Sequence, residues 1–434
     1  MLTRTAAAVA ATLALAVALP GADWPQFRGP ARDGHSADQG LLKMWPVGGP
    51  KLLWTYGDTG VGYAGEAVIG DRLYTCGGRG ADEFVIALDL TGAQPKEAWA
   101  AKIGPLFTWQ GNSWNAGPNV TPTVDGDRVY ALGGFGDLVC VDAKAGREIW
   151  RVNLGRDLAG EVNPIGGGLE RPTPLGWGNA AAPLVDGDQL VCVPGGKRGL
   201  LAGLDKATGK VLWQSVGVTD QATYSSPVLA TIGGVKQYVA ATNTGLVGIG
   251  TKGELLWRHT RAKVFDDVVI STPVVSDGVV AVSVGFGEGI EAVSVSKDAG
   301  GAFTAGKLYA SKEIQNRDGG LVRIGDHLYG HSEQGGWVCA EFKTGKVLWN
   351  DGKALTRGTI SAADGRLYCA AEKGGAVVLL DPSPDGWKEA GRFTLPQTSA
   401  LRKPSGMMWT HPVIANGRLY LRDQELLFCY DVKP

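Results

Sequence analysis

The chain has 434 residues, of which 44% are apolar and 20% charged, and its formal net charge at pH 7 is −1. This apolar fraction excludes an intrinsically disordered protein, because such a chain can bury a large core. Acidic and basic residues are interspersed, so we expect neither a basic stripe for nucleic acid nor a cationic patch for a membrane surface.

Residues 1–22 have the pattern of a secretory signal peptide. Arg4 precedes an apolar run from Ala6 to Leu19, and cleavage after Ala18 or after Ala22 fits the rule of small residues at the cleavage site. The run is short for a membrane span, and no Cys lies nearby to accept a lipid. We therefore expect an exported chain in the periplasm or outside the cell, without a membrane span after cleavage. A retained anchor is the alternative.

Residues 23–50 form a separate segment that is aromatic and proline-bearing at its start. Pro25 and Pro30 are incompatible with a helix across these positions. We expect 23–50 to lie extended across the body of the protein. The residues that follow, Lys51 to Tyr56, match the last strand of a repeat that has no earlier strands before it.

From residue 51 to the end, the chain consists of related units. One half of a unit is a strand, a tight turn and a second strand ending in Trp, as in Val139 to Trp150. The other half is a hairpin such as Thr123 to Tyr130, whose Asp-Gly turn supplies the positive φ of a two-residue connection. Four-stranded units at a spacing of roughly 40 to 60 residues predict a β-propeller.

The hairpins mark eight units. They begin near Glu66, Asn119, Asn179, Ser225, Ser271, Gly320, Ile360 and His411. The last unit stops before its Trp strand, and the strand at 51–56 supplies what it lacks. Closing the last blade in this way removes two exposed sheet edges. The sequence therefore predicts an all-β fold: a monomeric, eight-bladed propeller of four-stranded antiparallel blades over 51–434, with its last blade closed by an N-terminal strand.

Tryptophans recur at one position of the units, at a fixed distance after the turn Gly. They are Trp54, Trp150, Trp213, Trp257 and Trp349. One Trp per blade at one position predicts a packing element between blades rather than a binding cage. The fifth unit ends without such a Trp, and prolines interrupt the seventh.

The cysteines and histidines give no case for a metal site. The six cysteines are Cys76, Cys140, Cys192, Cys339, Cys369 and Cys429. They form no adjacent or Cys-x-x-Cys pair and fall at apolar strand positions, which favours small core residues; a disulfide is the alternative in an exported chain. His327 and His331 lie four apart on a predicted strand, about 13 Å from each other, too far to share an ion.

The turn motif Ala-x-Asp-x-x-Thr-Gly-x-x-x-Trp resembles the repeat of the pyrroloquinoline quinone (PQQ)-type propellers, and the segment from Trp24 to Pro30 resembles that of exported bacterial PQQ-like repeat proteins. Two classes share this repeat. Quinoprotein dehydrogenases hold PQQ between a Trp and an adjacent-cysteine disulfide, with calcium bound by Glu, Asn and Asp and an Asp as base. Non-catalytic propellers include BamB of the outer-membrane β-barrel assembly machinery. This chain has no Cys-Cys pair and no Cys-x-x-Cys-His haem site.

A site is expected where the segments before the innermost strands converge on one end of the central channel. The candidates for cofactor or ligand contact are Trp114, Trp177, Trp409, Arg317 and Arg357. The candidates for a metal ion are Glu66, Asn119, Asn179 and Asp267. Such a mouth fits a planar polar ligand or a cation. In the alternative interpretation these side chains satisfy buried backbone groups and plug the channel.

These features favour an exported, non-catalytic propeller that serves as a binding or assembly scaffold in the cell envelope. We expect an envelope protein as its partner, or a glycan or small planar ligand at the channel mouth. The alternative is an alcohol or sugar dehydrogenase dependent on PQQ and Ca²⁺, in which Asp267 or Glu66 is the base or a calcium ligand. No cofactor follows from the residues alone.

Overall fold

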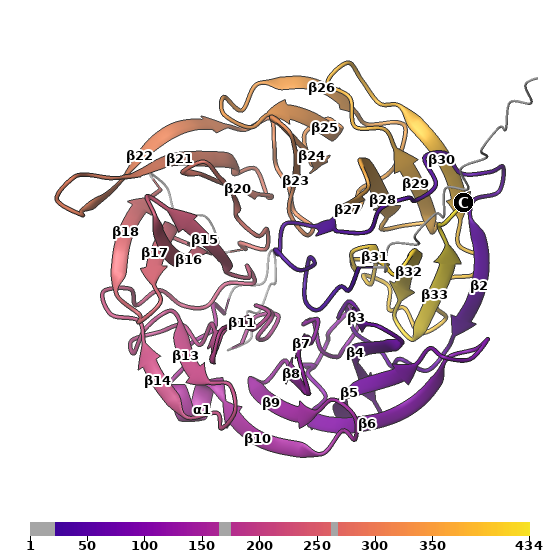
Figure 1. The fold of residues 1–434 in the computed structure, drawn as a ribbon, viewed down its shortest axis with the longest axis horizontal. Helices are drawn as coiled ribbons and strands as arrows, with labels where there is room; N and C mark the ends of the chain where they lie inside the picture. Colours follow the sequence, from indigo (N-terminus) through magenta and orange to yellow (C-terminus); the bar gives the residue numbers. More distant parts are fainter. Residues whose placement is uncertain (1–21, 165–174, 262–267) are drawn as a thin grey trace, which may run out of the picture.

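A computed structural model of the chain describes residues 22–164, 175–261 and 268–434. Their strands form eight sheets, which stand as blades around a central axis (Figure 1). Each blade has four antiparallel strands, and the seventh also carries a short parallel strand at its inner edge. The predicted all-β, eight-bladed propeller is confirmed.

The first four blades follow the chain in order, each from its inner to its outer strand. The first contains β3 (Ala67–Ile69), β4 (Arg72–Arg79), β5 (Asp82–Asp89) and β6 (Lys96–Pro105). The second contains β7 (Thr123–Asp125), β8 (Arg128–Leu132), β9 (Asp137–Asp142) and β10 (Glu148–Asn153), followed by the short helix α1 (Leu154–Leu158). The third contains β11 (Leu184–Asp186), β12 (Gln189–Cys192), β13 (Ala202–Asp205) and β14 (Val211–Gln214). The fourth contains β15 (Val228–Ile232), β16 (Val235–Thr242), β17 (Gly245–Gly250) and β18 (Leu255–Thr260).

The next three blades continue the same pattern. The fifth contains β19 (Val274–Ser276), β20 (Val279–Val284), β21 (Gly289–Lys297) and β22 (Phe303–Ser311). The sixth contains β23 (Val322–Ile324), β24 (His327–Ser332), β25 (Gly336–Glu341) and β26 (Val347–Asp351). The seventh contains β1 (His35–Ser36), β27 (Gly358–Ala363), β28 (Arg366–Ala371), β29 (Ala376–Leu380) and β30 (Glu389–Thr394).

The eighth blade is shared between the two ends of the described chain. Its inner strands are β31 (Val413–Ala415), β32 (Arg418–Asp423) and β33 (Leu426–Asp431), and its outer strand is β2 (Lys51–Tyr56). Figure 1 shows β2 beside β33 at the seam of the ring. β2 pairs antiparallel to β33, with Trp54 opposite Cys429. This is the predicted closure: β2 covers the edge of β33 and becomes the outer strand of the eighth blade.

The blade tryptophans lie between blades, as predicted. Trp150 lies against Gly209 in the turn of the third blade, where an added Cβ would stand 2.8 Å from the indole ring. The Trp150 indole Nε1 donates a hydrogen bond to the Lys206 carbonyl at 3.1 Å, so the ring fastens one blade to the next. Trp99 donates in the same way to the Ala143 carbonyl at 3.1 Å.

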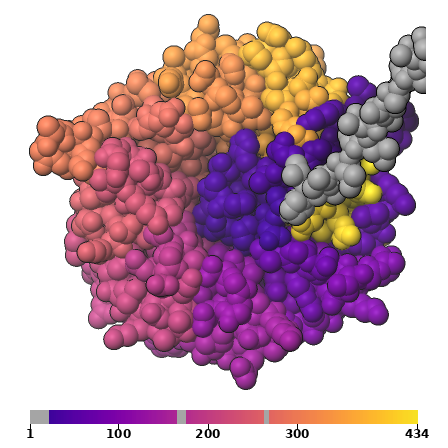
Figure 2. All heavy atoms as spheres, viewed as in Figure 1, coloured from indigo at the N-terminus to yellow at the C-terminus, as the bar shows by residue number. Residues whose placement is uncertain are grey.

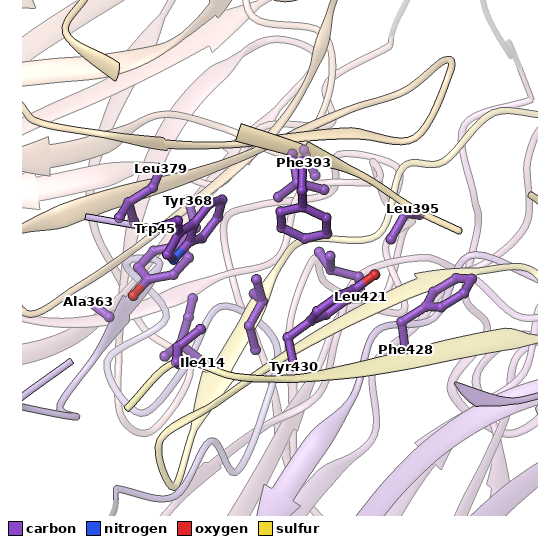
Figure 3. Packing of buried hydrophobic residues seen from close by; sticks show 14 of the residues in the cluster. Trp45, Ala363, Tyr368, Leu379, Phe393, Leu395, Ile414, Leu421, Phe428 and Tyr430 are labelled. Atoms are coloured by element: carbon purple, nitrogen blue, oxygen red, sulfur yellow. The ribbon is translucent and has the colours of Figure 1, made fainter. Parts of the chain in front are cut away.

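The fifth and seventh blades lack the Trp of the repeat, and a different residue takes its place in each. In the fifth blade Tyr309 takes the position, and its hydroxyl donates to the Phe342 carbonyl at 2.8 Å. In the seventh blade Gly391 stands there, and Trp45 of the N-terminal segment packs against it. Figure 3 shows Trp45 beside Tyr368 among the residues between blades seven and eight. A residue far away in the sequence thus supplies the aromatic ring that the repeat lacks.

Among the described residues, eight clusters of buried apolar side chains fill the ring, one at each interface between neighbouring blades. All six cysteines are buried and free, which confirms their prediction as small core residues. β24 carries both His327 and His331, on one strand as expected. Because every blade contributes to two clusters, the ring is held together around its whole circumference.

The N-terminal segment crosses the ring, and part of its length is folded into turns. Trp24 pairs with Val68 of the first blade, and β1 pairs with β27 of the seventh. Between them residues 26–34 form consecutive turns, with Arg28 and Arg32 at φ of 60° and 58°. These turns place the segment over the centre of the ring, and Figure 2 shows it covering the middle of this face.

The predicted signal peptide, residues 1–22, falls almost entirely outside the described residues. Within the ranges that the structure describes, no helix has the length and apolarity that a membrane crossing requires.

Candidate functional site

A cavity of about 190 Å³ lies in the central channel. The N-terminal segment lines it at one end, and the segments that precede innermost strands line its walls. The lining includes Trp24, Phe27, Arg28, Tyr63, Glu66, Phe107, Trp109, Trp114, Asn119, Trp177, Tyr224, Arg317, Asp318, Trp409 and His411. Since residues from most of the chain meet here, the closed ring and the N-terminal segment are both needed to form this cavity.

Aromatic rings form much of the wall. Trp177 lies between Trp114 and Tyr224, with ring centroids 6.2 and 5.2 Å away. Tyr63 and Trp409 form a second pair, 5.0 Å apart. The Tyr224 hydroxyl accepts a hydrogen bond from the Trp177 backbone N–H at 3.0 Å, which fixes the segment that carries this Trp. The wall therefore offers several ring faces to one small volume.

The end formed by the N-terminal segment carries a buried cation. The Arg28 guanidinium, 2% exposed, donates to the carbonyls of Gly319 and Leu321. Burial lowers the pKa of Arg28 to about 10, so the side chain stays charged at neutral pH. Beside it the Phe27 ring meets His411 edge to face at 5.5 Å. These contacts join the N-terminal segment to the inner ends of the sixth and eighth blades.

Glu66 is the buried carboxyl group of this lining that lacks a described hydrogen-bond donor. Its side chain is 0% exposed, and within the described ranges neither carboxyl oxygen receives a hydrogen bond from another residue. Burial raises the pKa of Glu66 to about 7, against an opposing effect of the Arg422 charge. A buried carboxyl group without a donor is unfavourable for folding, so its presence calls for an explanation.

A network of charged side chains borders the cavity on the side of the sixth and seventh blades. The Arg357 guanidinium pairs with Asp318 and with Glu372, at 2.8 Å in each case. Burial raises the pKa of Asp318 to about 6, and the Arg357 charge limits the rise. Arg317 pairs with Glu333 at 3.3 Å. The cation that each of these carboxylates needs is therefore supplied by the protein itself.

Six of the predicted site residues lie together. Those that line the cavity are Glu66, Trp114, Asn119, Trp177, Arg317 and Trp409. Asn179 is buried, and its side-chain amide donates to the Gly134 carbonyl at 3.1 Å. Arg357 lies outside the lining, held by its two carboxylates. Asp267 falls outside the described residues.

Sequence reasoning missed the residues that come from outside the repeat. Phe27 and Arg28 belong to the N-terminal segment, and Trp109 to the long connection between the first two blades. The aromatic residues of the segment at 24–27 were the available signal, but nothing in the sequence placed that segment at the channel. In the part of the chain that the structure describes, no group of three or more His, Cys, Asp or Glu side chains is arranged to hold a metal ion.

Comparison with known sequences identifies relatives of one kind. The family model described as outer membrane protein assembly factor BamB matches residues 81–351. The outer membrane protein assembly factor BamB of Burkholderia pseudomallei is 24% identical over 275 residues, which are 62% of this chain. The chain thus spans 60% of the length of this curated relative.

Two solved structures share the fold. BamB from Moraxella catarrhalis superposes with a TM-score of 0.57 at 17% identity, covering 88% of this chain and 97% of its own. The quinohemoprotein alcohol dehydrogenase from Comamonas testosteroni superposes with a TM-score of 0.61 at 11% identity, covering 94% of this chain and 80% of its own. At these identities the superpositions establish the propeller fold and leave function to the site itself.

Proposed function

Because the chain belongs to the family of the outer membrane protein assembly factor BamB, we propose that it is a non-catalytic propeller that serves as a binding or assembly scaffold in the cell envelope. The family match, which spans the second to sixth blades with part of the first, is the observation that carries this proposal. A closed ring packed at every blade interface suits a scaffold, since it presents a rigid surface to a partner.

Exposed apolar side chains at the rim of the ring support a protein partner. Val211, Leu212 and Val216 are exposed apolar residues on and just after β14, and Leu212 is 51% exposed. Ile149 occupies the equivalent position before the Trp of the second blade and is also exposed. Apolar side chains gathered on a surface mark protein contact sites. We assign the partner to this rim and expect it to be an envelope protein.

The location is part of the proposal. Residues 1–22 would direct export, and the chain would act in the periplasm or outside the cell as a monomer. A test is deletion of the gene in its own host, followed by measurement of the folded β-barrel proteins in the outer membrane. We expect their amount to fall and the wild-type gene to restore it. Unchanged levels in the deletion strain would refute the assembly role.

A matched pair of variants locates the contact. Complementation with L212D/V216D should fail, because two carboxylates in the apolar rim patch disrupt a protein contact. Complementation with L308D, at the exposed position before Tyr309 in the fifth blade, should succeed. Equal success of both would place the partner elsewhere on the ring.

The dehydrogenase alternative requires PQQ and Ca²⁺, and the described residues fit them only in part. Calcium takes about six to eight oxygen ligands. Glu66 and Asn119 line the cavity, whereas Asn179 lies outside the lining, and the side-chain amides of both asparagines donate to backbone carbonyls. The cavity, at about 190 Å³, is smaller than the roughly 300 Å³ from which drug-sized ligand pockets begin. We therefore derive no reaction step through either group. Dye reduction with alcohols or sugars in the presence of PQQ and Ca²⁺ would revive the alternative.

A second binding role is proposed for the channel itself. The aromatic cavity supports a glycan or a small planar ligand at the channel mouth, as the sequence suggested. This ligand site is separate from the rim residues, so ligand binding in the channel and partner binding at the rim can be tested independently.

A further inference from the structure

The unpaired polar atoms of the cavity lining define what its ligand must offer. In the described ranges, neither carboxyl oxygen of Glu66 has a hydrogen-bond donor from another residue, and neither Nε1 of Trp177 nor Nε of Arg28 has an acceptor. All three residues line the same cavity. Two other lining residues also carry an atom without a hydrogen bond, His411 at Nδ1 and Asp318 at Oδ2, and the Asp318 atom is ion-paired with Arg357. A ligand that satisfies them must both donate and accept hydrogen bonds. Hydroxyl groups do both.

The charges of the lining argue against a cationic ligand. Arg28 and Arg317 bring two positive charges to the cavity lining, and Glu66 and Asp318 bring two carboxyl groups. Asp318 is paired with Arg357 at 2.8 Å and Arg317 with Glu333 at 3.3 Å, whereas Arg28 is held by backbone carbonyls. An added cation would lie near an unneutralised arginine, whereas a neutral ligand meets no such repulsion.

The walls and the size of the cavity restrict the ligand further. Trp114, Trp177 and Tyr224 place neighbouring aromatic rings in the wall, against which a ligand with an apolar face can pack. The volume of about 190 Å³ lies below the roughly 300 Å³ of pockets for drug-sized molecules. One small ring fits these limits better than a chain of rings.

We propose that the channel cavity binds a single neutral sugar ring, either a free monosaccharide or the end of a glycan. Its hydroxyl groups donate to the Glu66 carboxylate and accept from Trp177 and Arg28, and its apolar face packs on the aromatic wall. This inference deepens the proposed channel-mouth ligand and does not depend on the protein partner at the rim.

Calorimetric titration of the purified full-length chain tests the ligand class. The probes are D-glucose, D-galactose and N-acetyl-D-glucosamine, with choline chloride and PQQ plus CaCl₂ as competing classes. We expect one sugar to bind one to one with a Kd of about 1 mM or tighter. Binding of choline or PQQ without any sugar would overturn the sugar assignment. Binding of no probe at all would mean that water alone fills the cavity, which overturns it equally.

Two variants with matched controls locate the site. E66Q should weaken sugar binding at least about tenfold, because it removes a charged acceptor. The control E291Q alters another buried carboxyl group, on β21 of the fifth blade, which lies 3.0 Å from His259 Nε2. It should leave the affinity for the sugar unchanged. Equal affinities of E66Q and wild type would exclude Glu66 from the site.

W177F keeps a ring face but loses the indole N–H, and we expect an affinity about fivefold weaker. The control W387F changes a half-buried Trp that hydrogen-bonds to Glu389 far from the channel. If W387F weakened sugar binding as much as W177F, the cause would be a general effect on the propeller rather than a lost contact with the ligand. Far-ultraviolet circular dichroism of each variant confirms that it is folded. Neither outcome bears on outer-membrane protein levels in the deletion strain, so failure here leaves the scaffold proposal in place.

Discussion

Glu66 and Glu83 are carboxyl groups of the same blade in two different surroundings. Both are 0% exposed, and burial raises the pKa of each to about 7. Glu83 on β5 accepts two backbone hydrogen bonds, from Phe107 at 3.1 Å and from Gly134 at 2.9 Å. Glu66, just before β3, accepts none from any other described residue.

The comparison shows that a shifted pKa does not by itself identify a functional residue. Glu83 fastens the start of the long connection after β6 to the second blade, so its burial is explained by the fold. The burial of Glu66 has no such explanation, although the residue lines the cavity. What separates the two is the set of hydrogen-bond partners, and the predictions below test that difference.

The largest effect on stability is expected at Arg422, whose positive charge opposes the rise in the pKa of Glu66. Its guanidinium is 1% exposed and donates to the carbonyls of Ala64 and Cys76 and to the Thr75 hydroxyl. R422M leaves these acceptors buried and unpaired, and should lower the free energy of unfolding by about 4 kcal/mol or more.

The measurement for R422M is the urea midpoint of unfolding. R392M is its control. Arg392 is an exposed residue paired with Glu389, so R392M should lower the free energy of unfolding by less than about 1 kcal/mol. A loss in R422M no larger than in R392M would contradict a structural role for the buried guanidinium.

The next effect is a dependence of stability on pH. The folded-state pKa of Glu83, about 7, lies above the ordinary value of 4.5, so the folded protein binds this proton more tightly than the unfolded chain. Its contribution is complete below pH 4.5 and is lost as the pH rises through 7. The loss amounts to at most about 3 kcal/mol.

Urea unfolding of wild type and E83Q across this range measures that contribution. Stability should fall with rising pH less steeply in E83Q than in wild type. Parallel pH profiles of the two proteins would show that Glu83 does not titrate in this range.

The smallest expected effects are the changes in stability caused by E83Q and E66Q at a single pH. Above pH 7, E83Q places an N–H₂ group against a backbone donor and should cost about 1 to 2 kcal/mol of unfolding free energy. E66Q removes a buried carboxylate without a described donor, so it should leave the stability unchanged or raise it. Thermal unfolding of both variants provides the test, and a larger loss in E66Q would reverse our assignment of the two sites.

The propeller was predictable because its signals are local. Asp-Gly turns such as Asp364-Gly365, with φ of 46° and 71°, and in most blades a Trp at a fixed distance after a turn mark the blades within a few residues. The closure by β2 followed from counting strands, since an orphan strand and an incomplete last unit complement each other.

The path of the N-terminal segment was not predictable, because it depends on contacts between distant residues. Arg28 adopts a positive φ that favours Gly, and it is held by Gly319, 291 positions further along the chain. Arg357 illustrates the same limit at the site. It precedes an innermost strand as expected, but carboxylates of neighbouring segments, Asp318 and Glu372, hold it outside the lining.

The most direct test of the difference between the two glutamates is a crystal structure of the chain soaked with the sugar that binds most tightly in calorimetry. We predict a sugar ring in the channel cavity, against Trp177, with a hydroxyl group within hydrogen-bond distance of Glu66 and no sugar near Glu83. A sugar bound outside the channel would contradict the account, because the unpaired carboxyl group of Glu66 would then have no part in ligand binding.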